Sequence, residues 1–99
     1  MLRVVQSFPD ETTADLFRER NTRAARRIPR ELWRVVQRKL KLLDAAARLD
    51  DLLIPAGNRL ESLKGDQAGR HSIRVNDQYR VTFRWEGGHA FEVAVEDYH

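Results

Sequence analysis

The hydrophobic and polar positions of this chain follow a helical pattern in the first half and an alternating pattern in the second. Over residues 29–48, apolar side chains recur at the spacing of one helix face, and the opposite face is basic. A shorter helix is expected to begin at Asp10, a favourable N-cap after the break at Pro9, and to end near residues 20–21. Residues 2–8 precede that break and are typical of a strand. The apolar face of the longer helix consists of Leu32, Val36, Leu40, Leu43 and Ala47.

Four segments of the second half have the alternation and composition of strands, at residues 59–63, 70–75, 78–86 and 89–96. Gly87-Gly88 and Asn76-Asp77 are typical tight turns, so neighbouring strands should pair antiparallel. The apolar face of the longer helix has to cover such a sheet. We therefore predict one α+β domain over residues 1–99, with an N-terminal strand, two helices and a mostly antiparallel sheet of three to four strands whose helices lie on one face.

The composition limits the chemistry that this domain can perform. The chain has 99 residues, and its 18 Lys and Arg against 15 Asp and Glu give a net charge of +3. It has no cysteine, which excludes disulfides, thiol catalysis and cysteine-ligated metal sites. The start of the chain is too short and too polar for a signal peptide, and no apolar run reaches the length of a membrane span. We therefore expect a cytoplasmic protein without a membrane partner.

The cations are unevenly distributed, because they crowd between Arg18 and Lys41. On the longer helix, a basic stripe of Arg30, Arg34, Arg38, Lys41 and Arg48 lies opposite the apolar face, and no acid is interleaved in it before Asp44. Such a stripe either solvates a helix face or provides a track for the phosphates of a nucleic acid. The absence of interleaved acids favours the second interpretation. The candidate RNA- or ribosome-binding residues of this basic stripe are Arg30, Arg34, Arg38 and Lys41.

Three further cations belong to the predicted sheet. Lys64 precedes Gly65 at a turn, whereas Arg74 and Arg80 alternate with apolar residues in the following strands. Because successive strand side chains point to opposite faces, Arg74 and Arg80 should leave the core together on the open face of the sheet. From this pattern alone, they are equally well explained as solvated surface arginines. Directly after the last predicted strand, the chain ends with an acid, a phenol and an imidazole, Asp97, Tyr98 and His99.

The order and spacing of these motifs resemble those of the HigB-like toxins of bacterial toxin–antitoxin pairs, a branch of the RelE/ParE superfamily. The shared features are an N-terminal strand carrying "SF", a Leu-rich helix, "LKGD", "YRVTF" and a terminal "DYH". The resemblance covers the whole chain and implies a RelE-like fold and a ribosome-dependent mRNA endoribonuclease that inhibits translation. It also implies a HigA-like helix-turn-helix antitoxin as partner, with promoter DNA bound only through that antitoxin. The catalytic residues that the resemblance implies are Lys64, Arg80, Asp97, Tyr98 and His99.

The sequence departs from the family pattern at two positions of the implied site. Some members carry a histidine where Glu61 stands here, and some have an arginine where this chain has Asn76, with Arg74 close by on the same run. These departures concern the proton donor and the residues that hold the phosphate. We therefore count Arg74 and Asn76 among the candidate RNA-binding residues and Glu61 as an alternative acid or base.

Cleavage of RNA by the ribose 2′-hydroxyl requires a base for that hydroxyl, stabilisation of the charged phosphorane and an acid for the leaving 5′-oxygen. Lys64 and Arg80 suit the second task, since lysine and arginine side chains stay charged at neutral pH. The base and the acid are therefore sought among Asp97, Tyr98 and His99. Because side chains can supply all three functions, no metal or other cofactor is expected.

Two other functions remain open from the sequence. A non-nucleolytic toxin of the ParE kind, which poisons DNA gyrase, would share the fold, but such relatives generally lack the complete set of Lys64, Arg80 and "DYH". A nucleic-acid- or protein-binding module of a toxin–antitoxin complex would use the basic stripe, but the chain has no recognisable helix-turn-helix motif. The nuclease is therefore the preferred hypothesis.

Overall fold

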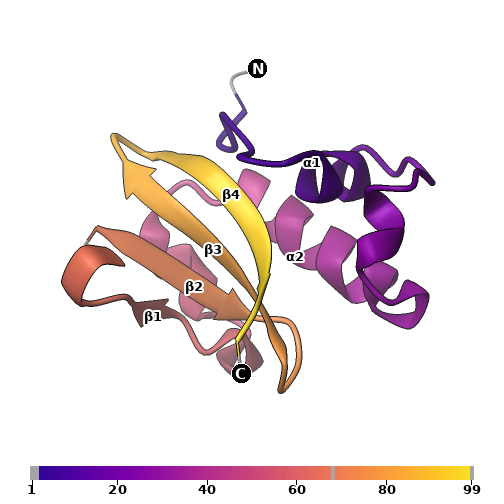
Figure 1. Ribbon diagram of the computed structural model, residues 1–99. Helices are drawn as coiled ribbons and strands as arrows, with labels where there is room; N and C mark the ends of the chain where they lie inside the picture. The colour runs from indigo at the N-terminus through magenta and orange to yellow at the C-terminus, as the bar shows by residue number, and fades with distance from the viewer. Residues whose placement is uncertain (1–2, 68, 99) are drawn as a thin grey trace.

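The computed structural model of the protein describes residues 3–67 and 69–98. In this part of the chain, four strands form one antiparallel sheet in the order β1-β2-β3-β4, and two helices cover one of its faces (Figure 1). The predicted α+β architecture, with the helices on one side of the sheet, is therefore confirmed. The strands are β1 (Glu61–Ser62), β2 (Arg70–Arg74), β3 (Tyr79–Glu86) and β4 (His89–Asp97), and the helices are α1 (Glu11–Phe17) and α2 (Trp33–Asp44).

Both helices are shorter than the sequence predicts. Asp10 caps α1 as expected, because its Oδ1 accepts a hydrogen bond of 2.9 Å from the Thr13 amide. The helix ends at Phe17, since Glu19 has a φ of +58°, which an α-helix cannot contain. The predicted longer helix consists of a 3-10 turn followed directly by α2. No helix of residues 3–67 and 69–98 is long and apolar enough to cross a membrane. The connecting 3-10 turns are η1 (Ala25–Arg27), η2 (Arg30–Leu32), η3 (Leu49–Leu53), η4 (Ala56–Asn58) and η5 (Gly65–Gln67).

The N-terminal segment is less regular than predicted. The sequence predicts a strand over residues 2–8, but the described part of it forms only one parallel bridge, between Val5 and Ala90 of β4. Two hydrogen bonds of 2.8 Å flank this bridge, and the Ser7 carbonyl accepts a third from the Val93 amide at 2.9 Å. Between these contacts, Glu92 of β4 has a φ of +52°, which disturbs the strand and interrupts the ladder. The segment is thus an irregular extension of the sheet beside β4.

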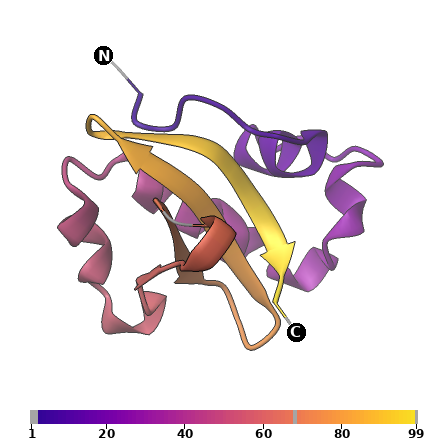
Figure 2. The same ribbon diagram turned by 60° about the vertical axis from the view of Figure 1, so that its left-hand side comes forward.

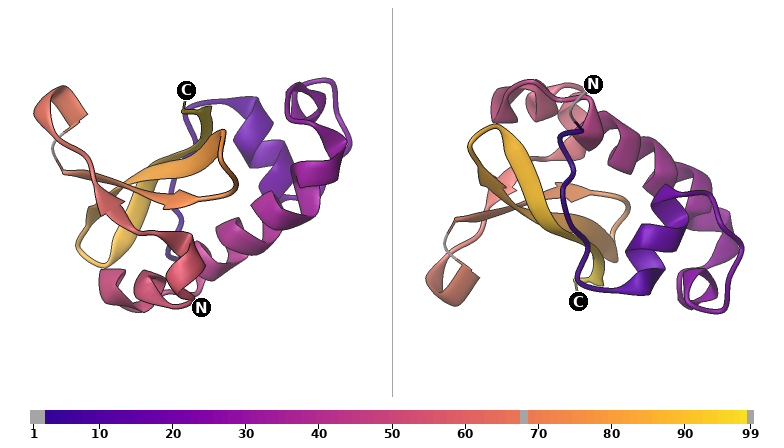
Figure 3. Two further views of the ribbon diagram at one scale, coloured as in Figure 1. Left: turned by 90° about the horizontal axis from the view of Figure 1, so that it is seen from below. Right: turned by 90° about the horizontal axis from the view of Figure 1, so that it is seen from above.

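The helices and the covered face of the sheet share one hydrophobic core. The two views of Figure 3 show both helices on the same side of the sheet. On α2, the predicted apolar face is confirmed at Val36, Leu40 and Leu43, which are fully buried. Ala47 lies beyond the end of α2 and is exposed, whereas Ala46 is buried. Because apolar and polar side chains alternate along the strands, the other face of the sheet is polar and open. The sheet contributes Ile73, Val81, Phe83, Val93 and Val95 to the core.

Tight turns set the register of the sheet. Gly87 and Gly88, with φ values of +58° and +80°, join β3 to β4 in a conformation that favours glycine. At the β2–β3 turn, the Asn76 side-chain oxygen accepts hydrogen bonds from the backbone amides of Gln78 (2.9 Å) and Tyr79 (2.7 Å). As a result, the end of β4 lies beside the β2–β3 turn (Figure 2). Asp97 and Tyr98 therefore lie at the same end of the sheet as Arg74 and Arg80.

Candidate functional site

The open face of the sheet gathers polar residues from all four strands. The pairing register aligns Arg74, Arg80 and Glu96 in one row across β2, β3 and β4. Glu61 of β1 lies opposite Ser72 of β2, two residues further along the sheet. Arg74 and Arg80 thus leave the core on the same face, as the alternation predicts. Glu96, a carboxylate that was not among the predicted site residues, completes this row. We call Arg74, Arg80 and Glu96 the Arg80 row.

The guanidinium group of Arg80 is held from two sides. Its Nε donates a hydrogen bond of 2.7 Å to Ser72 Oγ, and its Nη2 donates to the Arg59 carbonyl at 2.5 Å. Nη2 also lies 3.4 Å from the Ser72 carbonyl and 3.9 Å from Glu61 Oε2. The Arg80 side chain is only 11% exposed, whereas that of Glu61 is 60% exposed. Arg80 is therefore a largely buried cation with a fixed orientation and not a freely solvated one.

Arg74 and Asn76 lie next to this site but are engaged in the β2–β3 turn. Arg74 forms an ion pair with Asp77, and its side chain is 34% exposed. The side-chain oxygen of Asn76 accepts the two backbone hydrogen bonds of the turn. Asn76 therefore shapes the turn, while Arg74 is the more accessible of the two arginines in the row.

The chain end lies at the same end of the sheet as Arg80. Asp97 Oδ2 accepts a hydrogen bond of 3.0 Å from Gln78, and the Tyr98 amide donates one of 2.6 Å to the Gln78 carbonyl. Tyr98 is 41% exposed. Because strand side chains alternate, it is Glu96, and not Asp97, that shares the Arg80 face. His99 lies outside the described residues.

Lys64 is placed at the other end of the sheet. It follows Leu63, whose amide donates a hydrogen bond of 2.9 Å to the Arg70 carbonyl. Arg70 in turn pairs with Arg84, at the end of β3 away from Arg80. Arg84 and Arg80 are four positions apart on β3, a distance of about 13 Å. Lys64 is exposed at the base of the η5 loop, which projects from the sheet (Figure 3). The structure therefore does not place Lys64 beside Arg80.

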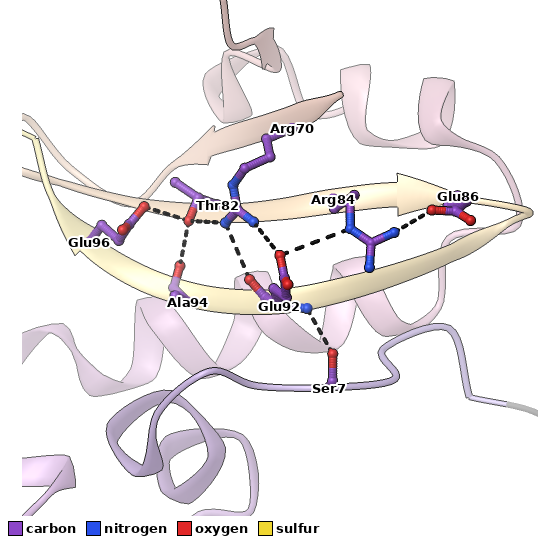
Figure 4. A network of polar contacts seen from close by, with 8 residues as sticks. All are labelled: Ser7, Arg70, Thr82, Arg84, Glu86, Glu92, Ala94 and Glu96. Carbon is purple, nitrogen blue, oxygen red and sulfur yellow. Dashed lines mark hydrogen bonds and ion pairs between the residues drawn. The ribbon is translucent and has the colours of Figure 1, made fainter. Parts of the chain in front are cut away.

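A polar network crosses the middle of the open face (Figure 4). Arg70 donates to Glu92 Oε2 at 3.1 Å and to Thr82 Oγ1 at 3.1 Å, and its side chain is 18% exposed. Thr82 in turn donates a hydrogen bond of 2.6 Å to Glu96 Oε2. The Glu92 amide donates to Ser7 Oγ at 2.9 Å, which ties the N-terminal segment to the same network. The network thus orients the Glu96 carboxylate within the row that it forms with Arg74 and Arg80.

Sequence reasoning missed Ser72, Thr82 and Glu96 as parts of this site. In the sequence, Ser72 and Thr82 are each two positions from Arg74 or Arg80, so strand alternation puts them on the same face. That signal identifies the face but not the hydrogen-bond partner, because the partner depends on the register between strands.

The basic stripe lies on the far side of the molecule. α2 packs its buried face on β3 and β4, so its basic face points away from the sheet and from Arg80. Arg30 stacks over the Trp33 ring at 4.8 Å, and Lys41 lies 3.6 Å from Glu19 Oε2. Within the described residues, Arg34 and Arg38 are exposed and form no ion pair. The stripe and the Arg80 row are therefore two separate cationic surfaces.

Two bases have pKa values lowered by their surroundings. Burial lowers the pKa of Lys39, and the neighbouring charge of Arg38 lowers it further. Burial also lowers the pKa of His71, whose ring packs against Phe83 at 5.9 Å. His71 Nδ1 is 3.2 Å from Ser62 Oγ. Both groups lie outside the Arg80 row, so they bear on stability more than on chemistry there.

The Arg80 row can bind a phosphodiester and stabilise negative charge on it. Two guanidinium groups offer planar, charge-assisted hydrogen bonds to phosphate oxygens. Glu96, Glu61 and the chain end provide groups that can accept or donate protons nearby. In the described part of the chain, no three His, Asp or Glu residues are grouped in a way that would hold a metal ion.

Comparison with known proteins identifies a family and several relatives. Residues 6–99 match the model of a family described as "RelE-like toxin of type II toxin-antitoxin system HigB". The chain is 46% identical over 71 residues to "Toxin HigB-1" of Vibrio cholerae serotype O1, covering 72% of this chain and 75% of that protein. It is 37% identical over 65 residues to "Endoribonuclease HigB" of Proteus vulgaris, covering 62% of this chain and 65% of that protein.

A solved structure shares the fold. A chain of the "YoeB-YefM complex from Staphylococcus aureus" superposes with a TM-score of 0.58 and covers 96% of this chain and 94% of its own length. At 21% identity, this likeness concerns the fold alone. These matches agree with the resemblance that the sequence motifs carry.

Proposed function

The chain belongs to the HigB-like toxins, the RelE-like toxins of type II toxin–antitoxin systems, and on this premise we propose that it is a ribosome-dependent endoribonuclease that cleaves mRNA and inhibits translation. The observation that supports this activity most directly is the row of Arg74, Arg80 and Glu96 beside the chain end. It combines fixed positive charge with proton-transferring groups on one open surface. The relative from Proteus vulgaris is named an endoribonuclease, which also supports the proposal.

In the proposed mechanism, Arg80 stabilises the charge that develops on the scissile phosphate. Its guanidinium is held in place before the substrate arrives, so little reorganisation is needed in the transition state. Arg74, in the same row and more exposed, contacts the same phosphate or its neighbour. Lys64 is separated from Arg80 by the length of the sheet, and we propose that it holds a phosphate further along the RNA strand.

The proton transfers are assigned to the chain end. Asp97, Tyr98 and His99 supply the base for the 2′-hydroxyl and the acid for the 5′-oxygen, as the family resemblance implies. Deletion of Tyr98 and His99 should therefore strongly weaken cleavage without unfolding the domain, because Tyr98 lies outside the hydrophobic core and follows the last strand. Glu96 and Glu61 are the first candidates if the deleted protein still cleaves at the wild-type rate.

The basic stripe is proposed to bind the ribosome. Arg30, Arg34, Arg38 and Lys41 are exposed on a surface remote from Arg80, so they can meet ribosomal RNA while the open face meets mRNA. We also propose a cytoplasmic location, and as partner a HigA-like helix-turn-helix antitoxin through which alone the toxin would meet promoter DNA. The side-chain amide nitrogen of Asn76 and the guanidinium of Arg74 complete the proposed RNA contacts at the open face.

Cleavage of a defined mRNA tests the proposal. The purified protein should cut the mRNA while purified ribosomes translate it, and should leave the same mRNA intact without ribosomes. Primer extension locates the cuts, and a translation reaction without the protein is the control. Intact mRNA on translating ribosomes would contradict the proposed activity.

A further inference from the structure

The orientation of Arg80 depends on groups that the proposed mechanism does not itself use. Ser72 Oγ accepts from Arg80 Nε at 2.7 Å, and Ser72 is completely buried. The Arg59 carbonyl accepts from Nη2 at 2.5 Å. Within the described residues, these contacts occupy Nε and Nη2 and leave Nη1 without a hydrogen bond. One edge of the guanidinium is thus fixed to the protein, and Nη1 remains for a ligand.

The backbone that presents the Arg59 carbonyl is in a costly conformation. Arg59 has a φ of +45° and a ψ of +57°, in the left-handed region that residues with a Cβ rarely adopt. This conformation follows the 3-10 turn η4 and directs the Arg59 carbonyl to Arg80. Left-handed backbone at a non-glycine residue persists only where surrounding contacts hold it, and it is often found near functional sites.

The residue before Arg59 is a buried asparagine whose side chain is hydrogen-bonded to the protein. Asn58 is fully buried, and its Nδ2 donates to the Leu52 carbonyl at 3.2 Å and lies 3.5 Å from the Ile54 carbonyl. Lys39 of α2 donates to the Asn58 side-chain oxygen. The polar contacts therefore run without a gap from α2 through Asn58 to the backbone that carries Arg59. Asn58 therefore connects the helical layer to the open face of the sheet.

We propose that Ser72 and the Arg59 carbonyl are positioning groups that fix the Arg80 guanidinium so that its Nη1 edge faces the scissile phosphate. This inference rests on the proposed function, since it assumes that Arg80 contacts RNA. The neighbouring Glu61 carboxylate is exposed and 3.9 Å from Nη2, so it gives way when phosphate binds. A guanidinium aimed in advance stabilises the transition state more than one that must first be ordered.

Nuclear magnetic resonance tests the geometry without any activity. In the wild-type protein, the Arg80 Nε proton should exchange with water more slowly than those of the exposed Arg34 and Arg38. Ser72→Ala should abolish that protection, whereas the matched variant Ser62→Ala, which changes a serine on the other face of β1, should leave it intact. Fast exchange of the Arg80 proton in the folded wild-type protein would overturn the proposal.

Kinetics test the consequence. Ser72→Ala should lower kcat on translating ribosomes by about 10- to 100-fold with little change in KM, because a misplaced group is penalised mainly in the transition state. Ser72→Thr, which keeps the hydroxyl, should retain more activity than Ser72→Cys, whose sulfur is a weak acceptor of similar size. In the Arg80→Lys background, Ser72→Ala should have no further effect, since the group that it positions is gone.

The outcomes separate the two claims. A full additional loss from Ser72→Ala in the Arg80→Lys background, or wild-type kcat for a folded Ser72→Ala protein, would show that Ser72 does not act through Arg80. If the wild-type protein fails to cleave mRNA, the proposed function falls, while the exchange measurement still decides whether Ser72 orients Arg80. Circular dichroism of each variant establishes that it is folded.

Discussion

Arginines on the two sides of this molecule are held in different ways. On the open face of the sheet, Arg70 and Arg80 are mostly buried, ion-paired and hydrogen-bonded to neighbouring strands. On the outer face of α2, Arg34 and Arg38 are exposed and form no ion pair within the described residues. A buried, bonded guanidinium has a fixed direction, whereas an exposed one acts mainly through its long-range field. Arginine can therefore serve two purposes in one molecule. On the open face it presents a charge in a fixed direction, and on α2 it attracts anionic partners through its field.

The largest expected effect is on the rate of cleavage. Arg80→Ala should reduce the cleavage rate of a translated mRNA by about 10²–10³-fold, because a preorganised charge donor is lost. Arg80→Lys should restore little, since an ammonium group cannot bond Ser72 and the Arg59 carbonyl and also face the phosphate. Arg34→Ala, the control on the other side, should cut at nearly the wild-type rate once bound. A folded Arg80→Ala protein with wild-type activity would remove Arg80 from the mechanism.

The next effect is on ribosome association. Replacing Arg34 and Arg38 together by glutamate should weaken co-sedimentation with ribosomes and make the remaining binding less steeply dependent on salt, because fewer counterions are released. Arg48→Glu serves as the control, because Arg48 is exposed beyond the end of α2 and, among the residues that the structure describes, forms an ion pair with Asp50 alone. Equal affinity and equal salt dependence for the double variant and the wild-type protein would assign the stripe to solvation.

A smaller effect is expected on stability. Arg70→Ala should lower the free energy of unfolding by about 1–3 kcal/mol, because it removes hydrogen bonds to Thr82 and Glu92 in a poorly exposed network. Arg38→Ala should change it by no more than about 0.5 kcal/mol, as is usual at an exposed site. Urea unfolding of both variants measures the difference. Identical midpoints would show that the open-face network adds no stability.

The smallest effect concerns His71, on the covered side of β2. Burial lowers its pKa below that of the unfolded chain, so the unfolded state binds more protons near pH 6. Stability should therefore be constant above about pH 7.5 and should decrease as the pH falls through about 6.5. His71→Gln should flatten this part of the profile, measured by urea unfolding at a series of pH values. An unchanged profile would assign the pH dependence to other groups.

The sequence predicted the faces of this molecule better than the contacts across them. Alternation along the strands correctly placed Arg74 and Arg80 on the open face, and helical spacing correctly buried Leu40 and Leu43. Both signals are local, because they depend only on the geometry of one element. The family and its fold were predicted from the motifs, and the family match and the superposed structure confirm them.

The contacts depend on register, which a single sequence does not specify. The motifs that contain Lys64 and Arg80 follow one another along the chain. The hydrogen bond between Leu63 and Arg70 nevertheless places Lys64 at the other end of the sheet. The left-handed Arg59 was also not predictable, because glycine and asparagine are the residues that usually signal such a conformation. The prediction of a regular N-terminal strand was wrong for a similar reason. The positive φ of Glu92, which interrupts the pairing, lies in β4 and not in the N-terminal segment itself.

Single-turnover cleavage at saturating protein concentration tests the division between the two surfaces most directly. Ribosomes carrying a labelled mRNA are mixed with increasing amounts of wild-type protein, of Arg80→Ala or of the Arg34→Glu, Arg38→Glu variant. We predict that the α2 variant requires more protein but reaches the wild-type maximal rate, whereas Arg80→Ala binds normally and stays about 10²–10³-fold slower at saturation. A lower maximal rate for the α2 variant, or recovery of the Arg80→Ala rate at high concentration, would contradict the account.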